Sequence, residues 1–270
     1  MRTLAPLGRR RVDVTGAGDV GAYRILHAAD PGGPVPQPGQ FYMLAAADGW
    51  GAGADERPYL PRAFSYLRAA GGELSFMLED VGPGTHRLAQ LEAGDTLWLT
   101  GPLGVGFRAP PGERRALLAG GGVGVPPLSA WAQGLVDDGA PVTAVLGFRD
   151  AHHAAGAALM TAGDVTVATD DGSVGHHGLV TELLAAELDA DEHAVVYACG
   201  PPGMLEAVRS LCAARDVPAQ LALEAGMACG FGACYGCVVA LREGGYARLC
   251  VDGPVLDADR LERVAQGAHA

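Results

Sequence analysis

Short runs in which apolar and polar residues partly alternate dominate the chain up to about residue 108. The clearest, Glu73-Leu-Ser-Phe-Met-Leu-Glu79, has the two-residue period of a strand with one face on a core. Gly/Pro clusters at 31–38, 71–72 and 82–84 separate the runs. Strands at this spacing predict a small antiparallel β-barrel. The expected strands are Val20–His27, Gln40–Leu44, Ala63–Arg68, Glu73–Leu78 and Thr96–Thr100.

After about residue 112 the pattern changes to continuous apolar runs that alternate with helical periodicity. Continuous runs are typical of parallel strands buried on both faces. The expected strands are Ala116–Ala119, Val142–Phe148, Val165–Thr169, Ala194–Ala198 and Gln220–Leu223, and the expected helices are Pro126–Val136, Gly178–Leu188 and Pro202–Arg215. This alternation predicts a doubly wound α/β domain with a parallel sheet, whose ligands bind at the carboxyl ends of the strands.

Length and charge narrow the functional classes. A chain of 270 residues predicts two domains, or two and a small appendage. The net charge of −12 argues against nucleic acid and anionic membranes as partners. All 19 basic residues are Arg, and without Lys neither a Walker-A loop nor Schiff-base chemistry is possible. No apolar run follows Arg9–Arg11, and Gly and Pro interrupt the uncharged stretch 116–136, so we expect a cytoplasmic protein without a membrane helix.

Two motifs in the first part are candidates for binding a cofactor with phosphate groups. Arg62 precedes Ser65 by three residues, so the guanidinium could grip a pyrophosphate while the hydroxyl reaches a ring nitrogen. The alternative is a surface Arg beside an ordinary strand Ser. The turn Gly82–Thr85 could offer free backbone N–H groups to an anion, or it could simply begin a helix with Thr85 as N-cap.

Glycine-rich turns in the second part are candidates for dinucleotide binding. The stretch from Leu117 to Pro126 runs from a strand into a turn with Gly120, Gly122 and Gly124, although it is not a clean G-x-G-x-x-G. The stretch Cys199–Met204 is a second glycine-bearing loop at a strand tip. Its cysteine could pack near a nicotinamide or be a small buried hydrophobe.

The charges after the next two strands leave the choice between NAD and NADP open. Asp150 could bind the ribose diol of NAD, whereas Arg149 could accept the additional phosphate of NADP. The segment Thr169–Ser173 adds negative charge, which weighs modestly against NADP.

Four of the six cysteines form a C-x4-C-x2-C-x12-C pattern: Cys229, Cys234, Cys237 and Cys250. This is the plant-type spacing of 2Fe–2S clusters, and the small residues around it let the backbone direct N–H groups at sulfur. A zinc knuckle usually has two C-x2–4-C pairs, and only one stands clear here. A disulfide framework suits small secreted chains. The pattern therefore favours an iron–sulfur cluster.

In this order, the barrel, the glycine turns and the four-cysteine tail resemble the ferredoxin-reductase superfamily of flavin and nicotinamide proteins. The chain looks most like the family of electron-transfer subunits of class 1B dihydroorotate dehydrogenases, because the cysteine tail follows the nicotinamide domain. The resemblance implies three domains: 1–110 for FAD, 111–223 for NAD and 224–270 for a 2Fe–2S cluster.

The resemblance also implies roles for matched residues. FAD would be held by Arg62, Ala63, Phe64, Ser65, Met77, Leu78, Glu79, Gly84 and Thr85. NAD would lie along Gly120, Gly122, Gly124, Cys199 and Gly200, with Glu224 beside both cofactors. The four cysteines of the tail would ligate the cluster. Two features depart from the family: the expanded loop Asp48–Glu56, and Phe64 where a branched aliphatic residue is expected.

The implied activity is electron transfer in pyrimidine biosynthesis. Electrons would pass from the FMN of a dihydroorotate dehydrogenase catalytic subunit through the cluster and FAD to NAD, in a complex with two copies of each chain. Met227, Phe231 and Tyr235 would contact that partner or shield the cluster from water. The small subunit of NADH-dependent ferredoxin:NADP oxidoreductase and the flavin subunit of sulfhydrogenases are similar. A non-catalytic zinc-bearing module is the alternative of another class.

Overall fold

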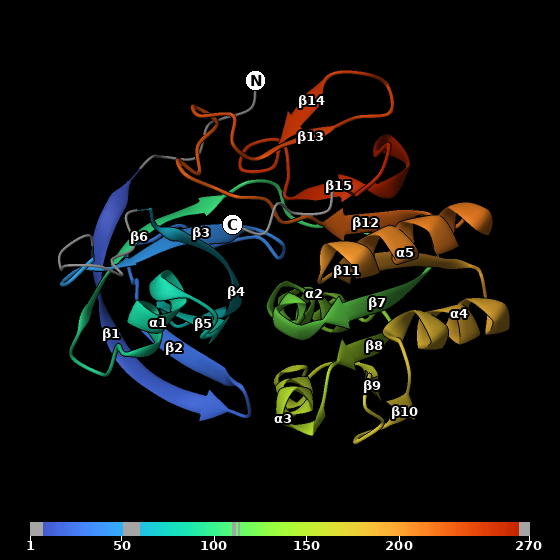
Figure 1. Ribbon diagram of the computed structural model, residues 1–270, viewed down its shortest axis with the longest axis horizontal. Coiled ribbons are helices and arrows are strands. Elements are labelled where there is room, and N and C mark those ends of the chain that lie inside the picture. Colours follow the sequence, from blue (N-terminus) through green and yellow to red (C-terminus); the bar gives the residue numbers. More distant parts are fainter. Residues whose placement is uncertain (1–7, 51–59, 110–111, 113, 265–270) are drawn as a thin grey trace.

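The computed structural model describes residues 8–50, 60–109, 112 and 114–264, and its first part is a closed antiparallel barrel (Figure 1). The strand order is β1-β2-β5-β4-β3-β6. The strands are β1 (Arg9–Val20), β2 (Tyr23–Ala29), β3 (Phe41–Ala46), β4 (Arg62–Ala70), β5 (Glu73–Glu79) and β6 (Thr96–Leu103). Leu44, Phe76 and Leu99 are fully buried inside the barrel. The predicted barrel is confirmed.

The hydrophobic pattern missed β1 because Arg, Gly and Asp occupy most of its positions. Its buried side chains are those of Val12 and Val14. The expected strand from Val20 was wrong at its start, since Val20 ends β1 and the chain turns at Gly21 with φ of +56°. That left-handed conformation favours glycine.

The second part is a seven-stranded sheet in the order β10-β9-β8-β7-β11-β12-β15. The pairs are parallel except for that of β15 with β12. Its strands are β7 (Arg115–Gly121), β8 (Val142–Phe148), β9 (Asp164–Thr169), β10 (His176–His177), β11 (Ala194–Cys199), β12 (Ala219–Ala222) and β15 (Val255–Asp257). The helices are α2 (Val125–Asp137), α3 (Ala151–Ala154), α4 (Val180–Ala190) and α5 (Pro202–Ala214). The doubly wound arrangement is confirmed.

Alternate residues of β7 pack on opposite faces of the sheet. Leu117 and Ala119 contact the core beneath α4 and α5, whereas Leu118 packs with α2. The α2 side also takes in Tyr23 and Met77 of the barrel, so α2 lies between the sheet and the barrel (Figure 1). This interface aligns the carboxyl ends of the parallel strands with one rim of the barrel.

The uncharged stretch 116–136 forms β7, a 3-10 turn (Gly122–Gly124) and α2. Within the described ranges, no helix combines the length and the hydropathy needed to cross a bilayer. Of the expected loop Asp48–Glu56, residues 51–56 lie outside the described residues.

The third part begins after β12 and contacts both other parts. A loop with three of the four cysteines leads to a hairpin of β13 (Val238–Ala240) and β14 (Tyr246–Arg248), and β15 then pairs with β12. Gly230 has a φ of +76°, and a Cβ there would lie 2.7 Å from Met43 Cγ, so the loop lies directly on β3. The Val105 N–H of the barrel side donates to Gly253 O at 2.5 Å.

Candidate functional site

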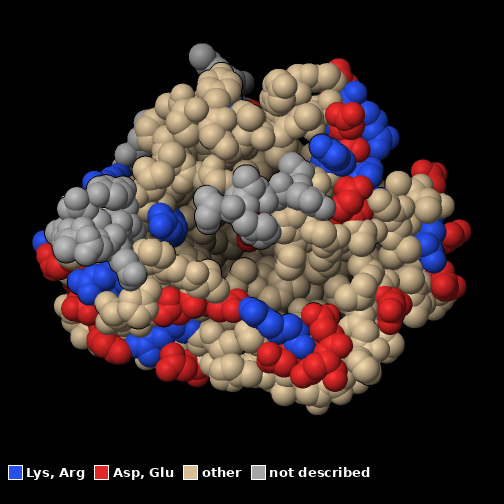
Figure 2. Space-filling model, in the orientation of Figure 1, with Lys and Arg blue, Asp and Glu red and all other residues tan. Residues whose placement is uncertain are grey.

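A cavity of about 760 Å³ separates the barrel from the parallel sheet and from the loop that precedes the cysteines. The barrel contributes the start of β4 and the end of β5, and the opposite wall comes from α2 and the chain after β12. The predicted residues that line it are Arg62, Ala63, Phe64, Ser65, Met77, Glu79, Thr85, Glu224 and Met227. The hollow lies at the centre of the face shown in Figure 2.

The Arg62 side chain lies against the short helix α1 (Pro83–Ala89). A Cβ on Gly84 would come within 2.4 Å of Arg62 Nε, so glycine makes room for the guanidinium. Arg62 Nη1 also donates to Leu60 O at 2.6 Å. Because a helix N-terminus carries partial positive charge, this corner of the cavity suits an anionic group such as a phosphate.

The expectation that Thr85 is the N-cap of α1 was wrong. Gly82 occupies the N-cap, and Thr85 is the third helical residue. Thr85 Oγ1 accepts hydrogen bonds from the Val81 and Gly82 N–H groups, both at 2.9 Å. These bonds hold the turn in the shape that brings α1 against Arg62.

Strand alternation divides the three predicted residues of β5 between two environments. Met77 and Glu79 line the cavity. Leu78 is fully buried and packs within the barrel core. Its side chain therefore points away from the cavity, and only its backbone is available to a ligand.

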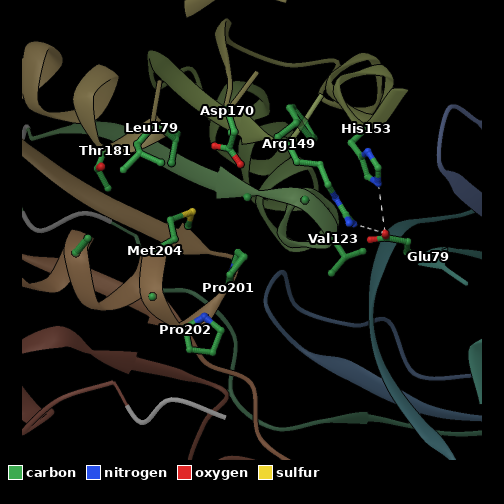
Figure 3. Close-up of a pocket in the computed structure, with 18 of the residues that line it drawn as sticks. Glu79, Val123, Arg149, His153, Asp170, Leu179, Thr181, Pro201, Pro202 and Met204 are labelled. Atoms are coloured by element: carbon green, nitrogen blue, oxygen red, sulfur yellow. Dashed lines mark hydrogen bonds and ion pairs between the residues drawn. The ribbon is translucent and has the colours of Figure 1, made fainter. Parts of the chain in front are cut away.

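A second cavity, of about 700 Å³, follows the carboxyl ends of β7, β8, β9 and β11 (Figure 3). Among the predicted residues, Gly122, Gly200, Glu79 and Glu224 line it. It shares Glu79, Val123 and Glu224 with the first cavity. Ligands bound in the two cavities would therefore meet at this shared wall.

The other predicted glycines of this region serve close packing. A Cβ on Gly120 would lie 2.7 Å from Leu146 Cδ2, and one on Gly124 would lie 2.1 Å from Cys199 O. Cys199 itself is 4% exposed and does not line the cavity. Burial, and then the nearby Glu224 carboxylate, raise the pKa of its thiol, so this thiol stays neutral.

Several lining residues were missed in the search for motifs, namely Tyr23, Asp170, Leu179, Thr181 and Met204. The only signal for one of them was the negative charge of the segment around Asp170. The others come from separate elements, and the strand order brings them to one edge of the sheet.

A polar network joins the barrel to the sheet at the shared wall. Glu79 forms an ion pair with Arg149, and Glu79 Oε1 lies 3.3 Å from His153 Nε2 (Figure 3). Asp150 Oδ1 accepts from the His153 N–H and faces His153 Nδ1 at 2.7 Å. The bonds from the His153 side chain and backbone lower the pKa of Asp150. Arg149 and Asp150 thus both have partners within the protein.

Glu224 completes the shared wall. Its carboxyl group is accessible from the cavity, but the surrounding walls exclude bulk water. This desolvation raises the pKa of Glu224 above its ordinary value.

The four cysteines of the tail lie together as two pairs. Cys237 Sγ and Cys250 Sγ are 3.2 Å apart, and Cys229 is hydrogen-bonded to Cys234. No three donor side chains of the described residues are grouped as ligands of one metal ion. Two pairs of thiols match a cluster of two irons, in which each iron takes two cysteines.

Backbone N–H groups surround the thiols. Gly232 N donates to Cys250 Sγ at 3.1 Å, and Gly236 N donates to Cys234 Sγ at 3.4 Å. Desolvation opposes ionisation of Cys229, but N–H groups of the loop outweigh it and lower its pKa to about 6. Cys229 is therefore mostly a thiolate at neutral pH, which is the form that binds iron. This donor set fits an iron–sulfur cluster.

The cysteine loop places its apolar neighbours differently. Tyr235 is 61% exposed and Phe231 is 42% exposed, beside the exposed Cys234. Met227 is half-buried and lines the first cavity. Figure 2 shows that the surface over this part of the chain carries few charged side chains.

Comparison with known families gives two matches. Residues 224–262 match the iron-sulfur cluster binding domain of dihydroorotate dehydrogenase B, and residues 118–210 match an oxidoreductase NAD-binding domain.

The chain is similar to several curated proteins named "Dihydroorotate dehydrogenase B (NAD(+)), electron transfer subunit". The one from Geobacillus kaustophilus is 41% identical, over 82% of this chain and 85% of the relative. The one from Geobacillus thermodenitrificans is 36% identical, over 93% of this chain and 98% of the relative.

Two solved structures share the fold. An NADH-dependent reduced ferredoxin-NADP oxidoreductase superposes with a TM-score of 0.78 at 24% identity, covering 95% of this chain and 91% of its own. Phthalate dioxygenase reductase gives a TM-score of 0.62 at 16% identity, with coverage of 96% and 97%.

Proposed function

The chain belongs to the dihydroorotate dehydrogenase B electron transfer subunit family, and from this membership we propose that it carries electrons from a dihydroorotate-oxidising partner to NAD. The partner is the FMN-containing catalytic subunit, and the reaction belongs to pyrimidine biosynthesis. The observation that carries the proposal is the order of three sites along one path. The cysteine pairs, the first cavity and the second cavity follow one another, and the cavities share a wall.

FAD occupies the first cavity in this proposal. Arg62, together with Gly84 and Thr85 of α1, holds the pyrophosphate in the positively charged corner. Ser65 and the backbone around Ala63 and Phe64 lie along the flavin, as do Met77, the backbone of Leu78, and Glu79. The raised pKa of Glu224 keeps a neutral carboxyl group at the shared wall more often than water would.

NAD occupies the second cavity. Gly122 and Gly200 let its backbone approach closely at the strand tips, while Gly120, Gly124 and Cys199 shape the turn from behind. The cysteine pairs hold a 2Fe–2S cluster, and the N–H groups around them stabilise its negative charge. When bound, the cluster passes single electrons and FAD exchanges a hydride with NAD.

The exposed face around Cys234, Phe231 and Tyr235 meets the partner in this proposal. An apolar surface with few charges suits the centre of a protein interface, where charged residues are depleted. We extend the proposal to a cytoplasmic complex with two copies of each chain, and to domains 1–110, 111–223 and 224–270.

The experiment is affinity purification of the chain from its native host without oxygen, followed by an assay for orotate formation from dihydroorotate and NAD. We expect an FMN-bearing chain to co-elute with this activity. A brown protein that reduces dyes with NADH but brings down no such activity would contradict the proposed partner and favour a ferredoxin- or sulfur-reducing relative. A colourless zinc protein would contradict the cofactors.

A further inference from the structure

The second cavity carries an uneven set of charges, and the inference drawn from it rests on the proposed binding of NAD there. Three carboxylates line it, those of Glu79, Asp170 and Glu224. Among the described lining residues, Arg149 is the single Arg. NADP differs from NAD by a phosphate on the 2′-oxygen of the adenosine ribose, so the charges near that ribose decide which coenzyme binds.

The topology assigns the two ends of this cavity. Glu79, Val123 and Glu224 also line the first cavity, so the nicotinamide end lies there, because a hydride passes only between rings in contact. Asp170 follows β9, which is two strands away from β7 in the order β9-β8-β7. The adenosine end therefore lies beside Asp170 and Thr181, at the start of α4.

Asp170 is the acidic group of this end that is free to meet a ligand. The neighbouring Asp171 accepts the Ser173 N–H at 2.9 Å and the Ser173 hydroxyl at 2.6 Å within its own turn. Asp150 is bonded to His153. Asp170 is exposed, and its carboxylate makes no hydrogen bond or ion pair with the described part of the chain (Figure 3).

The one Arg of the cavity is held at the opposite end. Arg149 extends from the end of β8 away from Asp170 and forms an ion pair with Glu79 of the barrel (Figure 3). Its charge is thus neutralised by a residue of another domain, at the nicotinamide end. A 2′-phosphate at the adenosine end would face Asp170 without a nearby Arg partner, and like charges in contact disfavour binding.

We propose that Asp170 selects NAD against NADP by accepting hydrogen bonds from the ribose hydroxyls and repelling a 2′-phosphate. Glu79 reinforces the selection because it keeps Arg149 away from the adenosine ribose. The coenzyme preference is therefore set partly by a barrel residue that does not contact the adenosine.

The test measures binding of ADP-ribose and 2′-phospho-ADP-ribose to the whole purified chain by calorimetry, since both ligands carry the adenosine end without the nicotinamide. We expect the wild-type chain to bind ADP-ribose at least about tenfold more tightly, which is about 1.4 kcal/mol. Asp170→Asn should reduce this ratio about tenfold, mainly by tighter binding of the phosphorylated ligand. Glu79→Gln combined with Asp170→Asn should reduce it further.

Asp164→Asn is the matched control, because Asp164 is exposed at the opposite end of β9 and loses the same charge outside the cavity. It should leave the ratio unchanged, and thermal melting checks the fold of every variant. A ratio in Asp170→Asn equal to that of wild type would overturn the role of Asp170. Failure of the wild-type chain to bind ADP-ribose would instead contradict the NAD site itself.

Discussion

Cys234 differs from the other cysteines of the tail in its exposure. Cys237 and Cys250 are each 2% exposed, and Cys229 is half-buried, whereas Cys234 reaches the surface. The cysteine that faces solvent is a candidate for the point where electrons enter from a partner. The FAD-binding candidates Arg62 and Ser65 lie on the barrel, outside this loop.

We therefore expect Cys234→Ser to abolish electron transfer to the partner, because the loop loses one thiolate of its four, while FAD stays bound. Iron content and the visible spectrum of the purified chain measure the two effects separately. Cys212→Ala is the control, since Cys212 is a buried thiol of α5. Equal loss of iron and FAD in Cys234→Ser would contradict independent sites.

The predicted glycines show how the same residue type serves different ends. Gly122 and Gly200 line the second cavity, whereas Gly120 and Gly124 only allow close packing. Their spacing in the sequence carries no such distinction. It depends on which atoms the fold places 2–3 Å from the missing Cβ, such as Cys199 O at 2.1 Å from Gly124.

The contact between α1 and β4 positions the guanidinium proposed to bind pyrophosphate. Gly84 leaves the space that Arg62 occupies, and Thr85 fixes the turn before the helix. The obstacle that a Cβ on Gly84 would meet is a flexible side chain, so Arg62 would move while the helix stays.

Gly84→Ala should accordingly weaken FAD binding by about tenfold, or about 1.4 kcal/mol, with little change in thermal stability. Titration of the apoprotein with FAD, followed by flavin fluorescence, measures the affinity. Gly82→Ala lies in the same turn, and its added Cβ meets no atom within 4 Å, so it should bind FAD as wild type does. If both variants lost affinity equally, the Arg62 contact would not be the cause.

The barrel and the sheet are joined through the chain after β12 as well as through α2. Residues 253–255 contact the barrel side at Val105 N and pair with β12 at the sheet edge. The end of the described chain is tied to α5, since the Val264 N–H donates to Glu206 Oε2 at 2.7 Å. Arg209 binds the same carboxylate with both Nε and Nη2, at 2.9 and 2.6 Å.

These bonds, first those from Arg209, lower the pKa of Glu206 to about 2 from an ordinary value of 4.5. A lowered folded-state pKa adds stability above pH 4.5 that is lost as the pH falls toward 2. Glu206→Gln should therefore lower the free energy of unfolding at pH 7 by about 1 kcal/mol, because solvent screens a partly exposed pair.

The difference between Glu206→Gln and wild type should disappear toward pH 2, as measured by denaturant unfolding across the pH range. Glu192→Gln changes an exposed carboxylate outside this network and should have little effect at any pH. A stability difference that persists undiminished at low pH would mean that packing, not ionisation, accounts for the loss.

Much of the architecture was readable from local order in the chain. Alternation at Glu73–Glu79 and continuous apolar runs such as Val142–Phe148 predict strands of two kinds, because burial on one or both faces selects those patterns. The cysteine spacing predicts a common centre because close ligands need a short loop. The strand β1 escaped detection because its side chains carry little hydrophobic signal.

The assignment of individual side chains to the cavities depended on contacts between distant segments. The ion pair of Glu79 with Arg149 spans 70 residues, and Asp170 meets the same cavity only through the order of β7, β8 and β9. Met77 and Leu78 are neighbours in sequence, yet the pleat sends one to the cavity and the other to the core. Local patterns record which faces are buried, but the partner of each face is set by packing across the whole chain.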